Sequence, residues 1–164
     1  MSRQRRDKIN YYLDIAETVS ERGTCLRRNF GAIIVKNDQI ISTGYSGAPR
    51  GRVNCSDMGT CRREKMAVPR GERYELCRSV HAEMNAVIHA SRADMLGSTL
   101  YLVGKEKSTG EYVEGTMPCQ MCKRVIINAG VRNVIVRDDN DNYRNLVVLD
   151  EWVNQQDDED GTGY

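Results

Sequence analysis

Two short motifs that lie far apart in the chain constrain its fold more than any other feature. The first, SVHAE at 79–83, holds His81, and the second, MPCQMC at 117–122, holds Cys119 and Cys122. One imidazole and two thiolates form a ligand set that zinc takes in tetrahedral sites, with the fourth position left to water. The fold must therefore bring both motifs to one ion.

Each motif stands where a helix is predicted to begin. Ser79 is a suitable N-cap for a helix that ends near Gly97, and Pro118 suits the first position of a helix that Gly130 ends. The two cysteines of the second motif are three positions apart, so both lie on one face of their helix and can reach one ion. The positive end of a helix dipole also favours the thiolate form.

Glu83 follows His81 by two positions, so its carboxylate is predicted to point beside the metal and not at it. Zinc lowers the pKa of a bound water from about 15.7 to roughly 7, which makes hydroxide available at neutral pH. A carboxylate beside that water is placed to move its protons. We therefore predict His81, Cys119 and Cys122 as ligands of a catalytic zinc and Glu83 as a proton shuttle.

The composition excludes several classes of protein. The chain has 164 residues, 40% of them hydrophobic and 29% charged, with no apolar run long enough to span a membrane. A formal net charge of +1 gives no broad footprint for nucleic acid, so a small anionic substrate fits better. Arg3, Arg5, Arg6 and Lys8 are basic, but no apolar signal segment follows them. We therefore expect a cytoplasmic protein whose six cysteines stay reduced.

Hydrophobic periodicity predicts an α/β protein. A helical period is present in residues 6–22, and β-branched runs at 30–35 and 39–45 flank the turn sequence Lys-Asn-Asp, which predicts an antiparallel hairpin. Further strands are expected at 99–103, 131–136 and 146–149. This order of elements predicts a central mixed sheet with helices packed on it.

Two segments depart from this regular pattern. Residues 46–76 are an irregular insertion rich in Gly, Pro, Arg and Cys, and so long a structureless stretch needs a functional or metal-binding explanation. Residues 154–164 form an acidic tail that we expect to be flexible and solvated. Residues 1–153 are expected to form a single domain.

His-x-Glu followed by Pro-Cys-x-x-Cys is a signature of zinc deaminases. The sequence resembles the deoxycytidylate (dCMP) deaminases of the cytidine deaminase superfamily over roughly residues 11–152, and the segments that carry the likeness are 25–35, 42–51 and 81–92. The resemblance implies a three-layer α/β/α cytidine-deaminase-like fold, in which helices cover both faces of a central mixed five-stranded sheet.

The resemblance also implies a reaction, the hydrolysis of dCMP to dUMP and ammonia, which supplies thymidylate synthesis. In this reaction Glu83 would take a proton from the water, protonate N3 of the ring and help the amino group leave. The resemblance further implies a homohexamer that dCTP activates and dTTP inhibits, with Mg²⁺ accompanying the triphosphate.

Five residues are candidates for binding the substrate. Arg27 and Arg28 precede the first strand, and the fork of an arginine suits phosphate oxygens, although a solvated basic pair is the alternative. Tyr45 and Ala82 belong to segments 42–51 and 81–92 of the likeness, and the resemblance implies that they bind the substrate. Ser46 stands where the family usually has an asparagine that holds the sugar hydroxyl. Its hydroxyl can still form hydrogen bonds but has a shorter reach, and the alternative is a tolerated loop residue.

The resemblance places a triphosphate effector at Gly47, Arg50 and Arg92. Gly47 and Arg50 belong to the Gly-rich segment 44–51, whose backbone can approach a nucleotide closely. An ordinary tight connection is the alternative for this segment. Arg92, at the end of the helix that begins near His81, could equally be a surface charge that complements the helix dipole.

The four remaining cysteines invite a second metal hypothesis. Cys25, Cys55, Cys61 and Cys77 would close a tetrahedral structural zinc site, and some members of the family carry such an ion. Their spacing is irregular and lacks a Cys-x-x-Cys pair, so buried free thiols remain the alternative.

Two functions from other classes stay open. A deaminase of another kind, acting on cytidine or on adenosine in tRNA, shares the zinc signature, and incubation with dCMP or tRNA discriminates between them. A zinc or redox module without catalysis is the other, and it has no need of Glu83.

Overall fold

The computed structural model describes residues 4–154 and contains a five-stranded sheet in the order β2-β1-β3-β4-β5. The strands are β1 (Arg28–Lys36), β2 (Gln39–Tyr45), β3 (Thr99–Glu106), β4 (Asn133–Arg137) and β5 (Tyr143–Val147). Neighbouring strands are antiparallel except for β3 and β4, which are parallel. The predicted central mixed sheet is confirmed.

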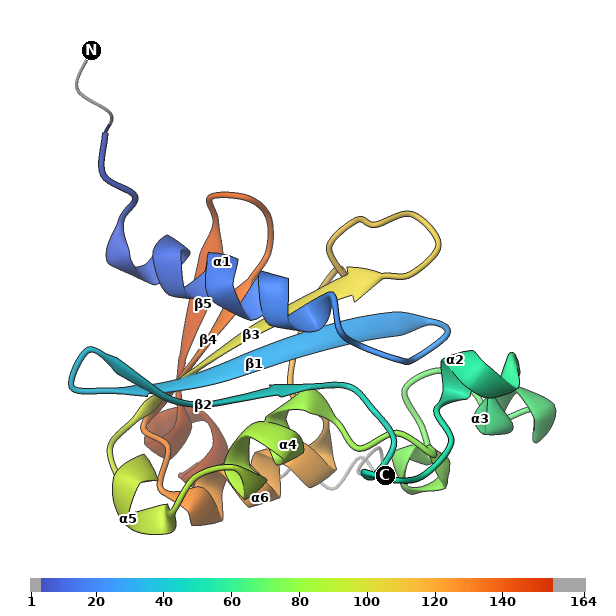
Figure 1. Ribbon diagram of the computed structural model, residues 1–164. Coiled ribbons are helices and arrows are strands. Elements are labelled where there is room, and N and C mark those ends of the chain that lie inside the picture. The colour runs from blue at the N-terminus through green and yellow to red at the C-terminus, as the bar shows by residue number, and fades with distance from the viewer. Residues whose placement is uncertain (1–3, 155–164) are drawn as a thin grey trace.

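Helices cover both faces of this sheet, as the predicted three-layer fold requires (Figure 1). The main helices are α1 (Lys8–Ser20) on one face and α4 (Ala82–Ile88) and α6 (Gln120–Ala129) on the other. Shorter helices are α5 (Arg92–Met95) and a π-helix at Leu149–Val153. None of the helices within residues 4–154 is long and apolar enough to cross a bilayer.

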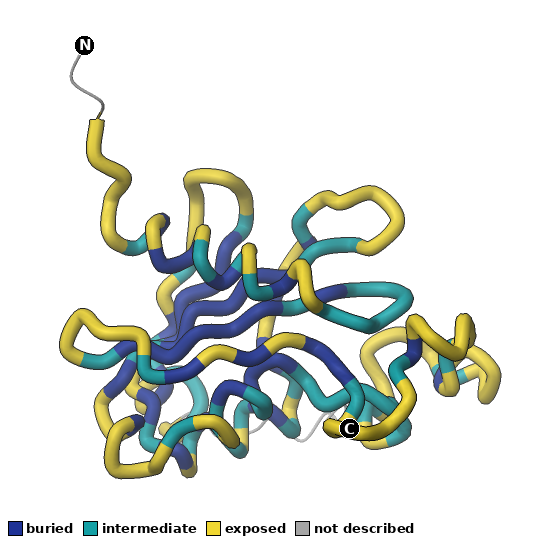
Figure 2. Tube along the Cα trace, in the orientation of Figure 1, coloured by how far each residue is buried: buried dark blue, intermediate teal, exposed yellow. Residues whose placement is uncertain are grey.

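Alternate side chains of β1 pack into the two apolar layers on opposite faces of the sheet. Ile33 and Val35 pack with Leu13 of α1, whereas Ala32 and Ile34 belong to the larger apolar cluster beneath α4 and α6. This alternation follows from the period of two in a strand, and it explains why β1 reads as a continuous apolar run. Figure 2 shows the buried strands enclosed between helices with exposed outer faces.

Most of the predicted elements are present. The helix predicted at 6–22 is α1, and the predicted hairpin is β1 and β2, with Asn37 and Asp38 both at positive φ in the turn. The last two strands are displaced from their predicted bounds, since β4 begins at Asn133 and β5 begins at Tyr143 and ends at Val147. Only Asn154 of the predicted acidic tail lies within the described residues.

The predicted starts of both motif helices are wrong. Ser79 is not the N-cap, because Val80 exchanges two backbone hydrogen bonds with Gly47 and the chain stays extended until His81, which takes the N-cap position. Pro118 likewise lies outside its helix, and Cys119 is the N-cap of α6. The first of these helices also ends at His89 and not near Gly97, since the side chain of Ser91 caps a separate helix, α5.

The 46–76 segment is less irregular than its sequence suggests. It contains the short helices α2 (Cys55–Met58) and α3 (Arg62–Lys65) and a 3₁₀ turn at Tyr74–Leu76. These elements extend beyond one end of the sheet (Figure 1), and most of their residues are exposed (Figure 2).

Gly44 allows α4 to lie directly on β2. A Cβ atom at this position would come within 2.3 Å of the Ala86 nitrogen and 2.4 Å of the Ala82 carbonyl oxygen, both of them backbone atoms of α4. Only a residue without a side chain permits so close an approach. Gly44 therefore sets the position of the helix that begins beside His81.

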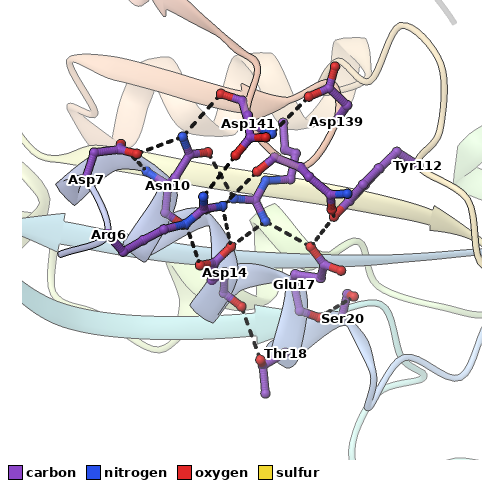
Figure 3. A network of polar contacts seen from close by, with 12 residues as sticks. Arg6, Asp7, Asn10, Asp14, Glu17, Thr18, Ser20, Tyr112, Asp139 and Asp141 are labelled. Carbon is purple, nitrogen blue, oxygen red and sulfur yellow. Dashed lines mark hydrogen bonds and ion pairs between the residues drawn. The ribbon is translucent and has the colours of Figure 1, made fainter. Parts of the chain in front are cut away.

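A buried arginine joins α1 to strand β4. Arg137 of β4 is 1% exposed, and its guanidinium contacts Asp14 at 2.8 Å and Glu17 at 2.9 Å and donates to the side-chain oxygen of Asn10 at 3.1 Å. Figure 3 shows Asn10, Asp14 and Glu17 projecting from α1 into this network. Burial opposes ionisation of Glu17, but hydrogen bonds from Lys105, Tyr112 and Arg137 outweigh it and lower the pKa of the carboxyl.

The substitution Gly44→Ala should destabilise the protein, because the added methyl group must displace the backbone of α4. Overpacking of this kind costs about 1–3 kcal/mol in the free energy of unfolding, measured by chemical denaturation. Gly47→Ala is the matched control, since its Cβ would meet nothing closer than 3.4 Å. Equal stability of the two variants would contradict the role of Gly44.

Glu17→Gln should lower the free energy of unfolding at pH 7 by about 1–3 kcal/mol, because it leaves the buried Arg137 with one carboxylate fewer. The pKa of Glu17 lies below its ordinary value of 4.5 in the folded protein, so its contribution is complete above that value and is lost as the pH falls through the folded pKa. The difference from wild type should therefore shrink as the pH falls below 4.5 and through the folded pKa. Glu21→Gln, at an exposed position outside the network, should change stability little at any pH.

Candidate active site

The two helix beginnings bring three metal-binding side chains together. The Nδ1 atom of His81 lies 3.4 Å from the Sγ of Cys119 and 3.5 Å from the Sγ of Cys122. The three possible ligand atoms all lie within 4.8 Å of one another. His81 and Cys119 are the N-caps of α4 and α6, and Cys122 lies in the first turn of α6.

These distances fit a zinc ion. With bonds of about 2.05 Å to nitrogen and 2.3 Å to sulfur at tetrahedral angles, a ligand nitrogen and sulfur are separated by roughly 3.6 Å. The observed 3.4 and 3.5 Å match this separation. Three protein ligands leave one tetrahedral position open, as in catalytic and not structural zinc sites. His81, Cys119 and Cys122 could therefore hold zinc with a place for water.

The protonation states of these three side chains depend on one another. Burial opposes charge on His81, but hydrogen bonds with Cys119 and Cys77 outweigh it and raise the pKa of the imidazole to about 10. The hydrogen bond from Cys122, together with the contact with His81, lowers the pKa of Cys119 to about 4, whereas Cys119 and burial raise the pKa of Cys122. Zinc requires a neutral imidazole and two thiolates, so binding would release protons.

Glu83 lies in the first turn of α4 and is only 5% exposed. Burial raises the pKa of its carboxyl, although the charge on His81 acts in the opposite direction. Glu83 lines the same cavity as His81 and Cys119. The carboxyl group therefore faces the space beside the possible metal ligands, in an environment that favours its protonated form more than water does.

The cavity contains about 840 Å³ of empty space, including the open solvent at its mouth. The metal-binding group forms one end. Among residues 4–154, four arginines line the remainder, namely Arg27, Arg28, Arg63 and Arg70, whereas Glu83 is the one acidic residue of the lining. This charge distribution favours an anionic ligand.

Three of the predicted substrate-binding residues line this cavity. Arg27 pairs with Glu64 at 3.2 Å, and Arg28 pairs with Glu106 at 2.9 Å. Ser46 is also in the lining, and its hydroxyl accepts a hydrogen bond of 3.2 Å from the backbone N–H of Phe30, so the hydroxyl proton stays available to a ligand.

The other two predicted substrate-binding residues lie outside this cavity. Neither Tyr45 nor Ala82 belongs to the lining. Ala82 is fully buried against the sheet, and the backbone carbonyl of Tyr45 accepts a hydrogen bond of 2.8 Å from the side chain of Asn85. Both residues serve the packing of α4 on β2.

The three residues predicted to bind an effector lie outside the same cavity. Gly47 is held by its two hydrogen bonds with Val80, and a nitrogen of Arg50 lies 2.9 Å from Nε2 of His89. The Nε of Arg92 donates to the carbonyl oxygen of Asn128 at 2.9 Å and so links α5 to α6.

The four remaining cysteines do not assemble a second site within residues 4–154. Among these residues, the possible ligand atoms of the His81 group lie close enough together to hold an ion, and those of Cys25, Cys55, Cys61 and Cys77 form no such cluster. Cys55 instead lies 3.7 Å from the hydroxyl of Ser79, and Cys25 accepts a hydrogen bond from the backbone of Arg27. Cys25, Cys61 and Cys77 nevertheless line the cavity. The structural zinc stays a prediction.

Sequence reasoning missed the contribution of the 46–76 segment to the cavity. Arg63, Arg70 and Tyr74 of this segment are all in the lining, and the ring of Tyr74 meets that of His81 edge-on at 5.2 Å. A signal was present, since an arginine-rich stretch without a regular period needs a functional explanation. The pattern could not tell which of its arginines faces inward.

Comparison with known proteins identifies the family. The family model for the cytidine and deoxycytidylate deaminase zinc-binding region matches residues 6–137. The chain belongs to this deaminase family. Its zinc-binding region includes both motifs that form the His81, Cys119 and Cys122 group.

Individual relatives from this deaminase family agree. The chain is 36% identical over 136 residues to the deoxycytidylate deaminase of Mycobacterium phage D29, covering 80% of this chain and 94% of that protein. It is 32% identical to the deoxycytidylate deaminase of Schizosaccharomyces pombe, covering 77% of this chain but only 35% of that longer protein.

A solved structure shows the same fold. The dCMP deaminase of cyanophage S-TIM5, in complex with dCMP and dUMP, superposes with a TM-score of 0.56 at 26% identity, covering 82% of this chain and 84% of that chain. The predicted cytidine-deaminase-like fold is therefore confirmed.

Cys122→Ser should remove most of the zinc from the purified protein, because it leaves two of the three protein ligands. Metal analysis by mass spectrometry measures this directly. Cys55→Ser is the matched control and should keep the zinc of the His81 group. One zinc per wild-type chain would refute the second, structural zinc, and full zinc content in Cys122→Ser would refute the assigned ligand set.

Proposed function

We propose that this chain is a zinc-dependent enzyme that hydrolyses dCMP to dUMP and ammonia. The observation that carries the proposal is the buried Glu83 carboxyl in the same cavity as His81 and Cys119. Relatives named deoxycytidylate deaminase support the choice of substrate, since the phage D29 protein matches over nearly its whole length. The arginine-lined cavity is consistent with the negative charge of a nucleotide.

The chemistry needs a nucleophile and a proton carrier. A zinc ion held by His81, Cys119 and Cys122 would supply Lewis acidity and make water acidic enough to act at neutral pH. Glu83 accepts the proton that the water loses and delivers it to N3 of the cytosine ring. It then takes the second proton of the water, from the hydroxyl now bonded to C4, and passes it to the amino group, which leaves as ammonia while the C4–O bond becomes the carbonyl of uracil.

The environment of Glu83 suits this double role. A carboxyl group with an ordinary pKa is a poor proton donor near neutral pH, because it is almost fully ionised. Burial raises the pKa of Glu83 and so brings it closer to the working pH. Since the side chain is nearly sealed from bulk water, the proton passes between Glu83 and the substrate and not to solvent.

The remaining parts of the proposal rest on the family resemblance. They are an allosteric response to dCTP and dTTP with Mg²⁺, binding of the effector near Gly47, Arg50 and Arg92, assembly as a homohexamer, a cytoplasmic location and a single catalytic domain in residues 1–153. Measuring ammonia release from dCMP with added dCTP or dTTP tests the regulation. Activity without any response would leave the deaminase proposal standing and remove the allosteric one.

A deaminase acting on cytidine or on tRNA is the second candidate, because such enzymes share the His-x-Glu and Pro-Cys-x-x-Cys signature. The matching relatives favour dCMP, since the phage D29 and S. pombe proteins are both named deoxycytidylate deaminase. Turnover of tRNA or cytidine in preference to dCMP would reverse the choice.

Glu83→Gln should lower kcat for dCMP by about 10²–10⁴-fold, because general acid–base catalysis contributes a factor of this size. The variant should keep its zinc, since Glu83 is a proton carrier and not a ligand. Glu114→Gln, at an exposed position outside the cavity, is the matched control and should keep wild-type turnover. A fully active Glu83→Gln enzyme would rule out the proton shuttle and favour a zinc module without catalysis.

A further inference from the structure

Arg63 is unusual in being a buried cation within an exposed segment. It lies in the short helix α3 and is 5% exposed, whereas its neighbours Arg62 and Glu64 are exposed. One guanidinium nitrogen donates to the carbonyl oxygens of Pro69 at 3.0 Å and Glu72 at 2.7 Å. The Nε atom is buried without a hydrogen-bond partner among the described residues.

The charge of Arg63 has no direct ion pair among residues 4–154, although Glu75 lies nearby, where a hydrogen bond from Arg73 and the charge of Arg63 both lower the pKa of its carboxyl. Within residues 4–154, the ion pairs of the cavity arginines join Arg27 to Glu64 and Arg28 to Glu106, and no carboxylate pairs with Arg63 or Arg70. A buried cation without a carboxylate costs free energy, so proteins retain one where an anionic partner binds. The partner in this case must enter from the cavity that Arg63 lines.

The position of Arg63 suits the phosphate end of a nucleotide. Its guanidinium lies over the ring of Tyr74 at 4.4 Å, and that ring meets the His81 imidazole edge-on at 5.2 Å. One aromatic ring therefore separates the guanidinium from the metal-binding group. A nucleotide whose base reacts beside His81 has its phosphate on the far side of the sugar, in the same cavity.

Arg70 is held at the mouth of the cavity by the contacts of Arg63. The two carbonyl groups that Arg63 binds, of Pro69 and Glu72, bracket the turn that carries Arg70 and Gly71. Gly71 has a φ of +82°, which fixes the direction of this turn. Arg70 is exposed and lines the cavity, so its guanidinium can reach an entering ligand.

We propose that Arg63 and Arg70 form the receptor for the phosphate of the nucleotide substrate. Arg70 contacts the phosphate, and Arg63 holds the turn that presents Arg70 and adds its own charge behind it. This inference rests on the proposed function, since it requires a nucleotide in the cavity. It implies that the 46–76 segment lets the protein discriminate nucleotides, which carry a phosphate, from nucleosides, which do not.

The test uses the zinc-loaded full chain and the variant Arg70→Met, with Arg62→Met as the matched control from the same segment but outside the cavity. Arg70→Met should raise KM for dCMP by about 10- to 100-fold while kcat changes less, because it removes a charge-assisted contact made in the ground state. Inorganic phosphate should compete with dCMP in wild type and in Arg62→Met but more weakly in Arg70→Met. An unchanged KM in Arg70→Met, or an equal rise in Arg62→Met, would overturn the proposal.

A second test compares KM for dCMP in Arg63→Lys, which keeps the positive charge, and in Arg63→Met, which removes it. The lysine keeps the charge but loses the guanidinium nitrogen that donates to both carbonyl groups, so we expect KM for dCMP to rise, but less than in Arg63→Met. Calorimetric binding of dUMP separates the two proposals. If wild type binds dUMP through Arg70 but does not turn over dCMP, the proposed function fails and the phosphate receptor stands. If dCMP is deaminated and Arg70→Met binds dUMP as wild type does, the receptor alone fails.

Discussion

The structure depends on the meeting of two helix beginnings at one point. His81 and Cys119 both stand at N-caps with extended backbones, so each side chain projects ahead of its helix and not along its flank. Cys122, one turn further along α6, closes the group from the side. This arrangement requires α4 and α6 to share one face of the sheet, which the crossover between the parallel strands β3 and β4 and the close contact at Gly44 together provide.

The architecture was predictable wherever local periodicity decides it. The β-branched run of β1 and the helical period of α1 predicted the correct elements, because a strand buried on both faces is apolar throughout and a helix packed on a sheet repeats every 3.6 residues. The helix starts were not predictable, because Val80 is held extended by Gly47, a residue distant in the sequence. Propensity at Ser79 cannot anticipate a contact that only the folded chain makes.

The same division applies to the candidate site. The spacing of the motifs identified the residues that meet at the possible metal position, because the chemistry of zinc restricts which side chains can do so. The motifs did not identify Arg63 and Tyr74, which also line the cavity and belong to elements of three or four residues. Such short elements have no period to detect, and their orientation follows from tertiary contacts such as the stacking of Arg63 on Tyr74.

The buried Arg137 also has a consequence for the order in which the contacts of the chain can form during folding. Its partner Glu17 lies 120 positions earlier, so this ion pair forms only after β4 has been made. During synthesis, which proceeds from the N-terminus, α1 can pack on β1 and β3 and pair Glu17 with Lys105 before β4 emerges from the ribosome. Contacts of such large sequence separation slow folding, since a long loop must close before they form. The contacts of α1 with Arg137 are therefore among the last that the chain can complete as it is synthesised.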